Sequence, residues 1–372
     1  MKRTLLSIAA ALLALSTLPA QAQKEALTLK DAIGRYCYIG TSLNQWQSDG
    51  QDVMATEVVR RHFNAAVAEN CMKSGELQPA EGMFDFRKAD KFVKYCEDNK
   101  LTAFGHCLVW HSQAPDWMFT DSSGRPVSRE VLISRLKKHI ATVAGHFRGH
   151  IHGWDVVNEA FEDDGSYRKS PLYNIIGEDF IEIAFRAAHE ADPEAELYYN
   201  DFSMAKPGKR EAVCRLVKRL KAKGLRIDAV GMQSHNGLDH PDLREYEKSI
   251  EAFAACGVKV MVTELDLNVL PSPQNFSGAS VEQRFEYEKR LNPYVDGMPK
   301  EKQKEFTERY LEFFKLYYKH RDKISRINLW GISDGNSWLN GWPVRGRTNY
   351  PLLFDRQYKA KPVVGEIIKL YK

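Results

Sequence analysis

The sequence is most informative at Lys259-Val260-Met261-Val262-Thr263-Glu264, where a nearly continuous apolar run ends in a carboxylate. Strands that helices cover on both faces have such runs, and they are typical of parallel sheets in α/β proteins. An amphipathic helix would instead show apolar residues at intervals of three and four. The stretch therefore predicts a buried parallel strand with a polar side chain at its carboxyl end.

Similar runs recur along the chain and alternate with longer segments of helical spacing. In one such segment Leu132, Leu136 and Ile140 mark an apolar face, and Ser128 is a candidate N-cap. Eight strands, each followed by a helix, predict a single α/β domain with the (β/α)8 barrel fold. The predicted strands are residues 34–39, 64–69, 102–109, 152–158, 196–200, 229–233, 258–264 and 327–333.

The amino terminus has the composition of a secretory signal peptide. It begins Met1-Lys2-Arg3, continues with a short apolar run and ends on Ala20-Gln21-Ala22. The apolar run is shorter than the roughly 20 residues that span a bilayer. We therefore expect cleavage after residue 22, export to the periplasm or the medium, and one folded domain over residues 23–372.

Composition excludes several classes of partner. The net charge is +4 and basic residues are dispersed, so we expect no nucleic-acid partner. No later segment is apolar enough for a membrane span, and we expect a monomer. The cysteines are scattered without a C-x-x-C pair, which leaves disulfide formation open. They are Cys37, Cys71, Cys96, Cys107, Cys214 and Cys256.

Two glutamates are the candidate catalytic residues. Glu159 and Glu264 end the fourth and seventh predicted strands, which lie opposite each other in an eight-stranded ring. The carboxyl ends of barrel strands build the active site. A buried carboxylate is costly unless it is paired, so a structural ion pair is the alternative for either residue alone. Together they suggest a retaining glycosidase, whose two carboxyl groups lie about 5–5.5 Å apart.

Aromatic residues near the predicted strand ends suit a sugar ligand, because sugars present flat C–H faces to aromatic rings. The tryptophans concerned are Trp46, Trp110, Trp117, Trp330, Trp338 and Trp342. A metal site is the alternative, since His106, His111 and His235 also lie near strand ends. No strand end combines three histidines with a carboxylate, so we expect no metal.

Six motifs in order resemble family 10 glycoside hydrolases and cover nearly the whole chain after residue 22. Any one of these motifs would be weak evidence, whereas all six in the family's order are specific. They are Gly105-His106-Cys107-Leu108-Val109-Trp110-His111-Ser112-Gln113, Trp154-Asp155-Val156-Val157-Asn158-Glu159, Tyr199-Asn200-Asp201, Gln233-Ser234-His235, Thr263-Glu264-Leu265-Asp266 and Trp330-Gly331-Ile332-Ser333-Asp334.

The resemblance implies an endo-1,4-β-xylanase that acts on xylan and xylo-oligosaccharides, retains anomeric configuration and needs no cofactor. It implies that Glu159 is the acid/base and Glu264 the nucleophile. Asn158 would bind the sugar 2-hydroxyl, and His235 would support the nucleophile with Asp266 as its partner. The residues implied to contact substrate are Glu69, Asn70, Lys73, His106, Trp110, Gln233, Trp330 and Trp338.

Two other functions stay open at this point. A retaining barrel hydrolase of cellulose or mannan would carry the same carboxylates, and a polysaccharide-binding protein would share the fold. The chain departs from the family pattern at Ser74-Gly75, Phe202-Ser203 and Gly335-Asn336, which affects subsites remote from the cleavage point. The long segment 268–300 is expected to form part of the leaving-group side of an open cleft.

Overall fold

The computed structural model describes residues 27–372 except residue 277, so the predicted signal peptide lies outside the described residues. Its sheet has nine parallel strands in the order β6-β5-β4-β3-β2-β1-β9-β8-β7, and pairing of β6 with β8 closes the ring. The short β7 pairs with the outer part of β8. The strands are β1 (Tyr38–Leu43), β2 (Ala65–Ala68), β3 (Thr102–Val109), β4 (Gly153–Asn158), β5 (Glu196–Asp201), β6 (Ala229–Met232), β7 (His235–Gly237), β8 (Lys259–Asn268) and β9 (Ile324–Leu329).

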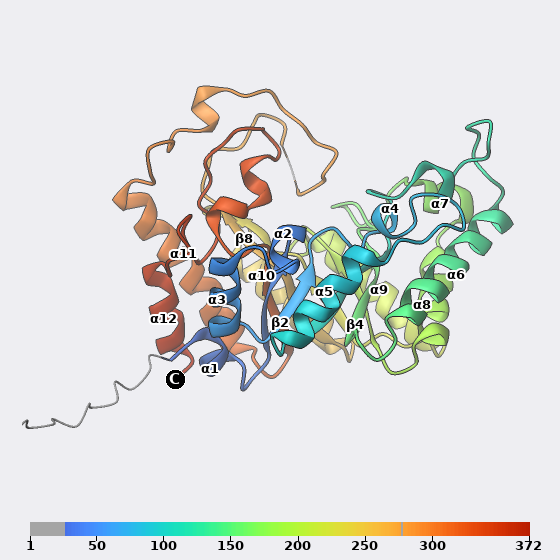
Figure 1. Ribbon diagram of the computed structural model, residues 1–372, viewed down its shortest axis with the longest axis horizontal. Helices are drawn as coiled ribbons and strands as arrows, with labels where there is room; N and C mark the ends of the chain where they lie inside the picture. The colour runs from blue at the N-terminus through green and yellow to red at the C-terminus, as the bar shows by residue number, and fades with distance from the viewer. Residues whose placement is uncertain (1–26, 277) are drawn as a thin grey trace, which may run out of the picture.

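Helices alternate with the strands around this ring, which confirms the predicted (β/α)8 barrel (Figure 1). α12 packs against both α1 and α11, so the two ends of the described chain meet on one side of the barrel. The longer helices are α3 (Val53–His62), α5 (Arg87–Asp98), α6 (Arg129–His146), α8 (Phe180–Ala191), α9 (Pro207–Ala222), α10 (Leu243–Ala255), α11 (Lys300–Lys319) and α12 (Pro362–Leu370). The shorter ones are α1 (Leu29–Ile33), α2 (Gln45–Ser48), α4 (Ser74–Leu77) and α7 (Pro171–Ile176).

Local sequence explains where α6 begins and which face it buries. Ser128 is its N-cap, and the side chain accepts a hydrogen bond from the amide of Val131. Leu132, Leu136 and Ile140 are buried, as their spacing predicts. Among the described residues, no helix combines the length and apolarity needed to cross a membrane.

The first strand was predicted too early. The prediction placed it at 34–39, whereas Gly34 ends α1 and β1 begins at Tyr38. Thr41 and Ser42 interrupt the apolar pattern of the observed strand, although both side chains are buried in the barrel. The seventh barrel strand, β8, continues past Glu264 to Asn268 because β7 supplies pairing partners for its last three residues.

A plug of large side chains fills the lower part of the barrel. A cluster that includes Phe104, Tyr198 and Met261 is separate from the main core between strands and helices. The guanidinium of Arg326 lies over the Phe104 ring at 4.1 Å and is almost completely buried. The barrel is therefore a packed body below its mouth, as in other barrels of this type.

Candidate active site

Glu159 and Glu264 lie at the mouth of the barrel, and each is only 5% exposed. Glu159 follows β4 and has φ of 59°, a left-handed conformation that is costly for a residue with a side chain. Such strain concentrates at functional sites, where the surrounding structure enforces it. Glu264 lies in β8, three strands from β4 around the closed ring.

A chain of amide side chains connects the two carboxylates. Gln233 Nε2 donates to Glu159 Oε1 at 2.8 Å and to Asn158 Oδ1 at 3.2 Å. Asn200 Nδ2 donates to Asn158 Oδ1 at 3.0 Å and to Glu264 Oε1 at 2.8 Å. The amide oxygen of Asn158 thus accepts from both neighbours, and its Nδ2 has no partner among the described residues, so it can donate to a ligand.

Glu159 is in an environment that favours its protonated form. Burial raises its pKa to about 7, and the negative charge of Asp201 adds to this effect, followed by that of Glu264. Hydrogen bonds from Gln233 and from Trp110 Nε1, which lies 2.8 Å from Oε2, oppose the rise. A carboxyl with this pKa can act as a general acid near neutral pH.

The surroundings of Glu264 favour its ionised form. Burial works against its ionisation, but hydrogen bonds from His235 and Asn200 and the charges of His106 and His235 outweigh burial and lower the pKa. His235 lies between two carboxylates, 3.2 Å from Glu264 Oε2 and 3.0 Å from Asp266 Oδ2. Burial disfavours its charged form, yet these carboxylates raise its pKa to about 10. His235 is therefore an imidazolium at neutral pH and donates to both.

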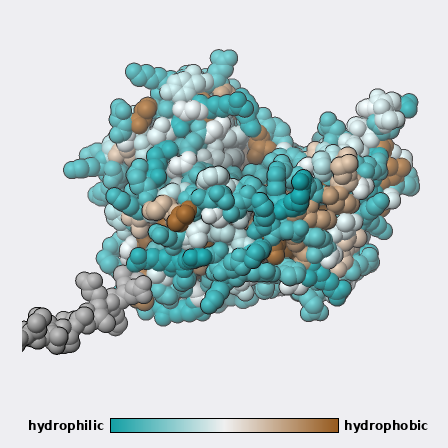
Figure 2. Space-filling view, in the orientation of Figure 1, coloured by the Kyte–Doolittle hydropathy of each residue, from teal (hydrophilic) through white to brown (hydrophobic). Residues whose placement is uncertain are grey.

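The substrate-contact residues named from the sequence all line one cavity of about 440 Å³ around the two glutamates. Lys73 Nζ donates to Asn70 Oδ1 at 2.9 Å and lies over the Trp110 ring at 5.0 Å. Trp338 Nε1 donates to Asp266 Oδ2 at 2.7 Å. The residues brought together here are Glu69, Asn70, Lys73, His106, Trp110, Gln233, Trp330 and Trp338. The space-filling surface dips between the loops at the left of the view and the arm that carries α7 (Figure 2).

The sequence profile of Glycosyl hydrolase family 10 matches residues 28–370. This chain belongs to that family. It is 58% identical over 345 residues to endo-1,4-beta-xylanase A of Xylanibacter ruminicola, with 93% of this chain and 94% of the relative covered. A solved family 10 endoxylanase retrieved from a sugarcane soil metagenome superimposes with a TM-score of 0.89 at 46% identity, covering 92% of this chain and 99% of that one. A xylanase of Thermoanaerobacterium saccharolyticum, solved as a complex with xylotriose, has a TM-score of 0.79 and 36% identity, over 93% and 99% of the two chains.

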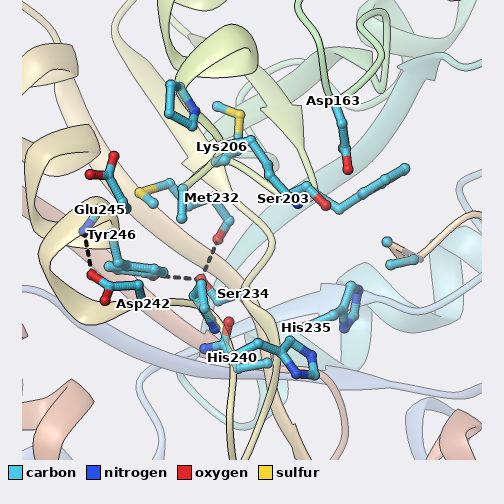
Figure 3. Close-up of a pocket in the computed structure, with 18 of the residues that line it drawn as sticks. Asp163, Ser203, Lys206, Met232, Ser234, His235, His240, Asp242, Glu245 and Tyr246 are labelled. Carbon is cyan, nitrogen blue, oxygen red and sulfur yellow. Dashed lines mark hydrogen bonds between the residues drawn. The ribbon is translucent and has the colours of Figure 1, made fainter. Parts of the chain in front are cut away.

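A second hollow of about 480 Å³ extends this family 10 site beyond His235 (Figure 3). His235 and Ala279 border both hollows. Ser234 forms part of the wall, with its hydroxyl donating to the carbonyl of Met232 at 3.0 Å and bonded to the Tyr246 hydroxyl at 2.6 Å. The first cavity holds both glutamates, so the second hollow continues the cleft away from them.

The sequence motifs give no role to Asn200, although it lies in the Tyr199-Asn200-Asp201 motif. Its side chain has the space it needs because Gly231 faces it: a Cβ at Gly231 would lie 2.3 Å from Asn200 Oδ1. Trp342 also lines the first cavity and stacks on Trp338, with 4.3 Å between ring centroids. The position of Asn200 at the end of a strand could have indicated that it belongs to the site. The stacking of Trp342 depends on loop conformation, which the sequence pattern does not predict.

Two of the three histidines that suggested a metal site are hydrogen-bonded to carboxylates. His106 Nδ1 lies 2.9 Å from Asp155 Oδ2, and His235 has the two partners given above. Within the described part of the chain, potential ligand atoms converge only at Glu247, Glu251 and His320, on the helical exterior of the barrel. Of the tryptophans predicted at the rim, Trp46 and Trp117 line neither hollow.

Proposed function

We propose that this family 10 protein hydrolyses internal β-1,4 bonds of xylan with retention of configuration, and that Glu159 and Glu264 perform the chemistry. The observation that carries the proposal is the opposite effect of the surroundings on the two carboxyl groups. The pKa of Glu159 is raised to about 7 and that of Glu264 is lowered. Retaining glycosidases need one protonated and one ionised carboxyl group at the start of the reaction.

In the first step Glu264 attacks the anomeric carbon and Glu159 gives its proton to the departing glycosidic oxygen. Attack forms an ester between Glu264 and the sugar, which neutralises the nucleophile. The pKa of Glu159 then falls, so that the same group accepts a proton from the incoming water. Asn158 supports both steps as a donor to the sugar 2-hydroxyl, a contact that strengthens in an oxocarbenium-like transition state.

His235 and Asp266 act on the nucleophile and not on the sugar directly. The imidazolium of His235 donates to Glu264 and is itself held by Asp266. This arrangement keeps Glu264 ionised although it is buried. The tryptophans of the cavity provide faces on which a xylose ring can pack.

Substitution of each glutamate tests the assignment. Glu264→Ala should abolish hydrolysis of every substrate. Glu159→Ala should slow xylan hydrolysis by roughly 10²–10⁴-fold, while a substrate with a very good leaving group still forms the glycosyl-enzyme. Azide should then rescue Glu159→Ala and give a product of retained β configuration. An α product from that variant would reverse the two roles, and Glu308→Ala, at an exposed position on α11, is the matched control.

Substrate class is tested by reducing-sugar release from xylan, cellulose and mannan. Preferential release from cellulose or mannan would favour the alternative hydrolase, and no release from any of them would favour a binding protein. We also propose that residues 1–22 export the chain to the periplasm or the medium and that it works as a monomer. Amino-terminal sequencing of the secreted protein and light scattering test these two points.

A further inference from the structure

The long connection between β8 and α11 takes part in the catalytic cleft. Ala279, Val281, Glu282 and Arg284 line the same cavity as the two glutamates. Ala279 also borders the second hollow, so this segment passes the point where the two hollows join. In Figure 1 the connection, yellow to orange, rises above the barrel.

Both ends of segment 279–285 are anchored, one in an apolar cluster and the other on the loop that follows β9. Ala279 is 4% exposed and belongs to an apolar cluster with Phe202, Leu339 and Trp342. At the other end the amide of Phe285 donates to the carbonyl of Pro343 at 3.0 Å, and Phe285 forms a β-bridge with Val344. These anchors fix both ends of the segment.

The middle of the segment reaches the opposite side. The Glu282 carboxylate lies near Ser112, and its Oε1 is 3.8 Å from His111 Nε2. His111 and Ser112 follow β3, which is opposite β8 in the closed ring. The chain therefore bridges the cleft from β8 to β3, and the Glu282 carboxylate lies on the distant side.

We propose that segment 279–285 is a strap across the cleft, that Glu282 is its latch, and that a xylan polymer is bound only after the latch opens. The proposal rests on the proposed xylanase function. A sugar in the glutamate-lined cavity fits below the closed strap, whereas a chain that occupies both hollows must pass Ala279. The strap thus makes Glu282 a specificity-determining residue that distinguishes short from long substrates.

The latch is weak enough to open during turnover. The Glu282 side chain is 55% exposed, so water competes for its contacts. Burial lowers the pKa of His111 to about 4, so this imidazole is neutral near pH 7 and adds no ion pair. An exposed contact of this kind changes an equilibrium by at most about fivefold. We expect the effect of its removal to be of that size.

The first test compares Glu282→Ala with Glu286→Ala, an exposed glutamate on the same connection that lines neither hollow. Each is assayed on soluble xylan and on an aryl β-xylobioside. Glu282→Ala should lower KM for xylan by up to about fivefold and should change KM for the aryl substrate less. Equal changes on both substrates, or the same change in Glu286→Ala, would overturn the proposal. Wild-type activity on the aryl xylobioside tests the proposed function, and only the ratio between substrates tests the strap.

The second test locks the strap. In the double variant Ser112→Cys, Glu282→Cys, a bis-methanethiosulfonate reagent with a two-carbon spacer should form one disulfide with each new thiol and release methanesulfinate, because its spacer replaces the reach of the glutamate side chain. The cross-linked protein should lose xylan hydrolysis, keep aryl xylobioside hydrolysis and recover fully with dithiothreitol. Absence of the cross-link by mass spectrometry would contradict the bridge, and a cross-linked protein that still degrades xylan would contradict its role.

Discussion

The indole of Trp110 should set the alkaline limit of activity through Glu159. Its Nε1 donates to Glu159 Oε2 at 2.8 Å inside the protein, where the bond favours the ionised carboxylate. A hydrogen bond to a charged group contributes about 1.5–3 kcal/mol, and about 1.36 kcal/mol corresponds to one pKa unit. The indole N–H also bonds the protonated acid, though less strongly, so the lower end of this range applies. Trp110→Phe should therefore raise the pKa of Glu159 by about one unit.

The measurement is kcat/KM against pH on a xylo-oligosaccharide, whose poor leaving group requires the acid. The alkaline limb should move from about pH 7 in wild type towards about pH 8 in Trp110→Phe, because the acid keeps its proton longer. Trp117→Phe is the control, since that indole donates to the carbonyl of Gln78 away from the glutamates. An alkaline limb that stays in place or moves to lower pH would refute the reasoning.

Four further outcomes are expected. Trapping Glu264 as a 2-fluoro glycosyl ester should lower the pKa of Glu159 below about 7, and carbon NMR of labelled protein measures it. His235 has a folded pKa of about 10 against an ordinary value of 6.5, so the unfolding free energy should fall as pH rises between these values. Urea titrations of His235→Gln at several pH values should show no such fall. Gly105→Ala should destabilise the fold by at least about 1–3 kcal/mol, since the new Cβ would lie 2.1 Å from the Trp154 ring. Gly145→Ala in α6 meets no neighbour and should instead stabilise it by about 0.5–1 kcal/mol in calorimetry.

Sequence alone predicted the parts of the fold that depend on local periodicity. The apolar runs identified β3 with its correct bounds, because Thr102–Val109 is buried along nearly its whole length. The same reasoning misplaced β1, where Thr41 and Ser42 interrupt the apolar pattern although both face the interior. Burial of small polar side chains in a barrel depends on the closed ring, which no local window of sequence contains.

The candidate site was predictable because its residues lie at or near the carboxyl ends of predicted strands. Glu159 and Gln233 follow strand ends, and Glu264 lies in the outer half of its strand, so a barrel necessarily brings them to one mouth. The contacts of the strap were not predictable, because they bring Glu282 close to His111 and pair Phe285 with Val344 through irregular backbone. The large influence of Asp201 on Glu159 was also missed, since it requires the actual positions of buried charges.

The plug below the barrel mouth closes the reaction chamber from beneath. Among the described residues, Phe104, Tyr198 and the overlying Arg326 fill the barrel below the carboxylates, so water approaches the anomeric carbon from the mouth. Water that cleaves the glycosyl-enzyme must then enter by the side that the departing sugar has just left. A xylo-oligosaccharide that returns before water does occupies the same approach and becomes the acceptor itself. At high product concentration the protein should accordingly lengthen chains as well as shorten them. The size distribution of its products should depend on the concentration of xylo-oligosaccharide that competes with water at the barrel mouth.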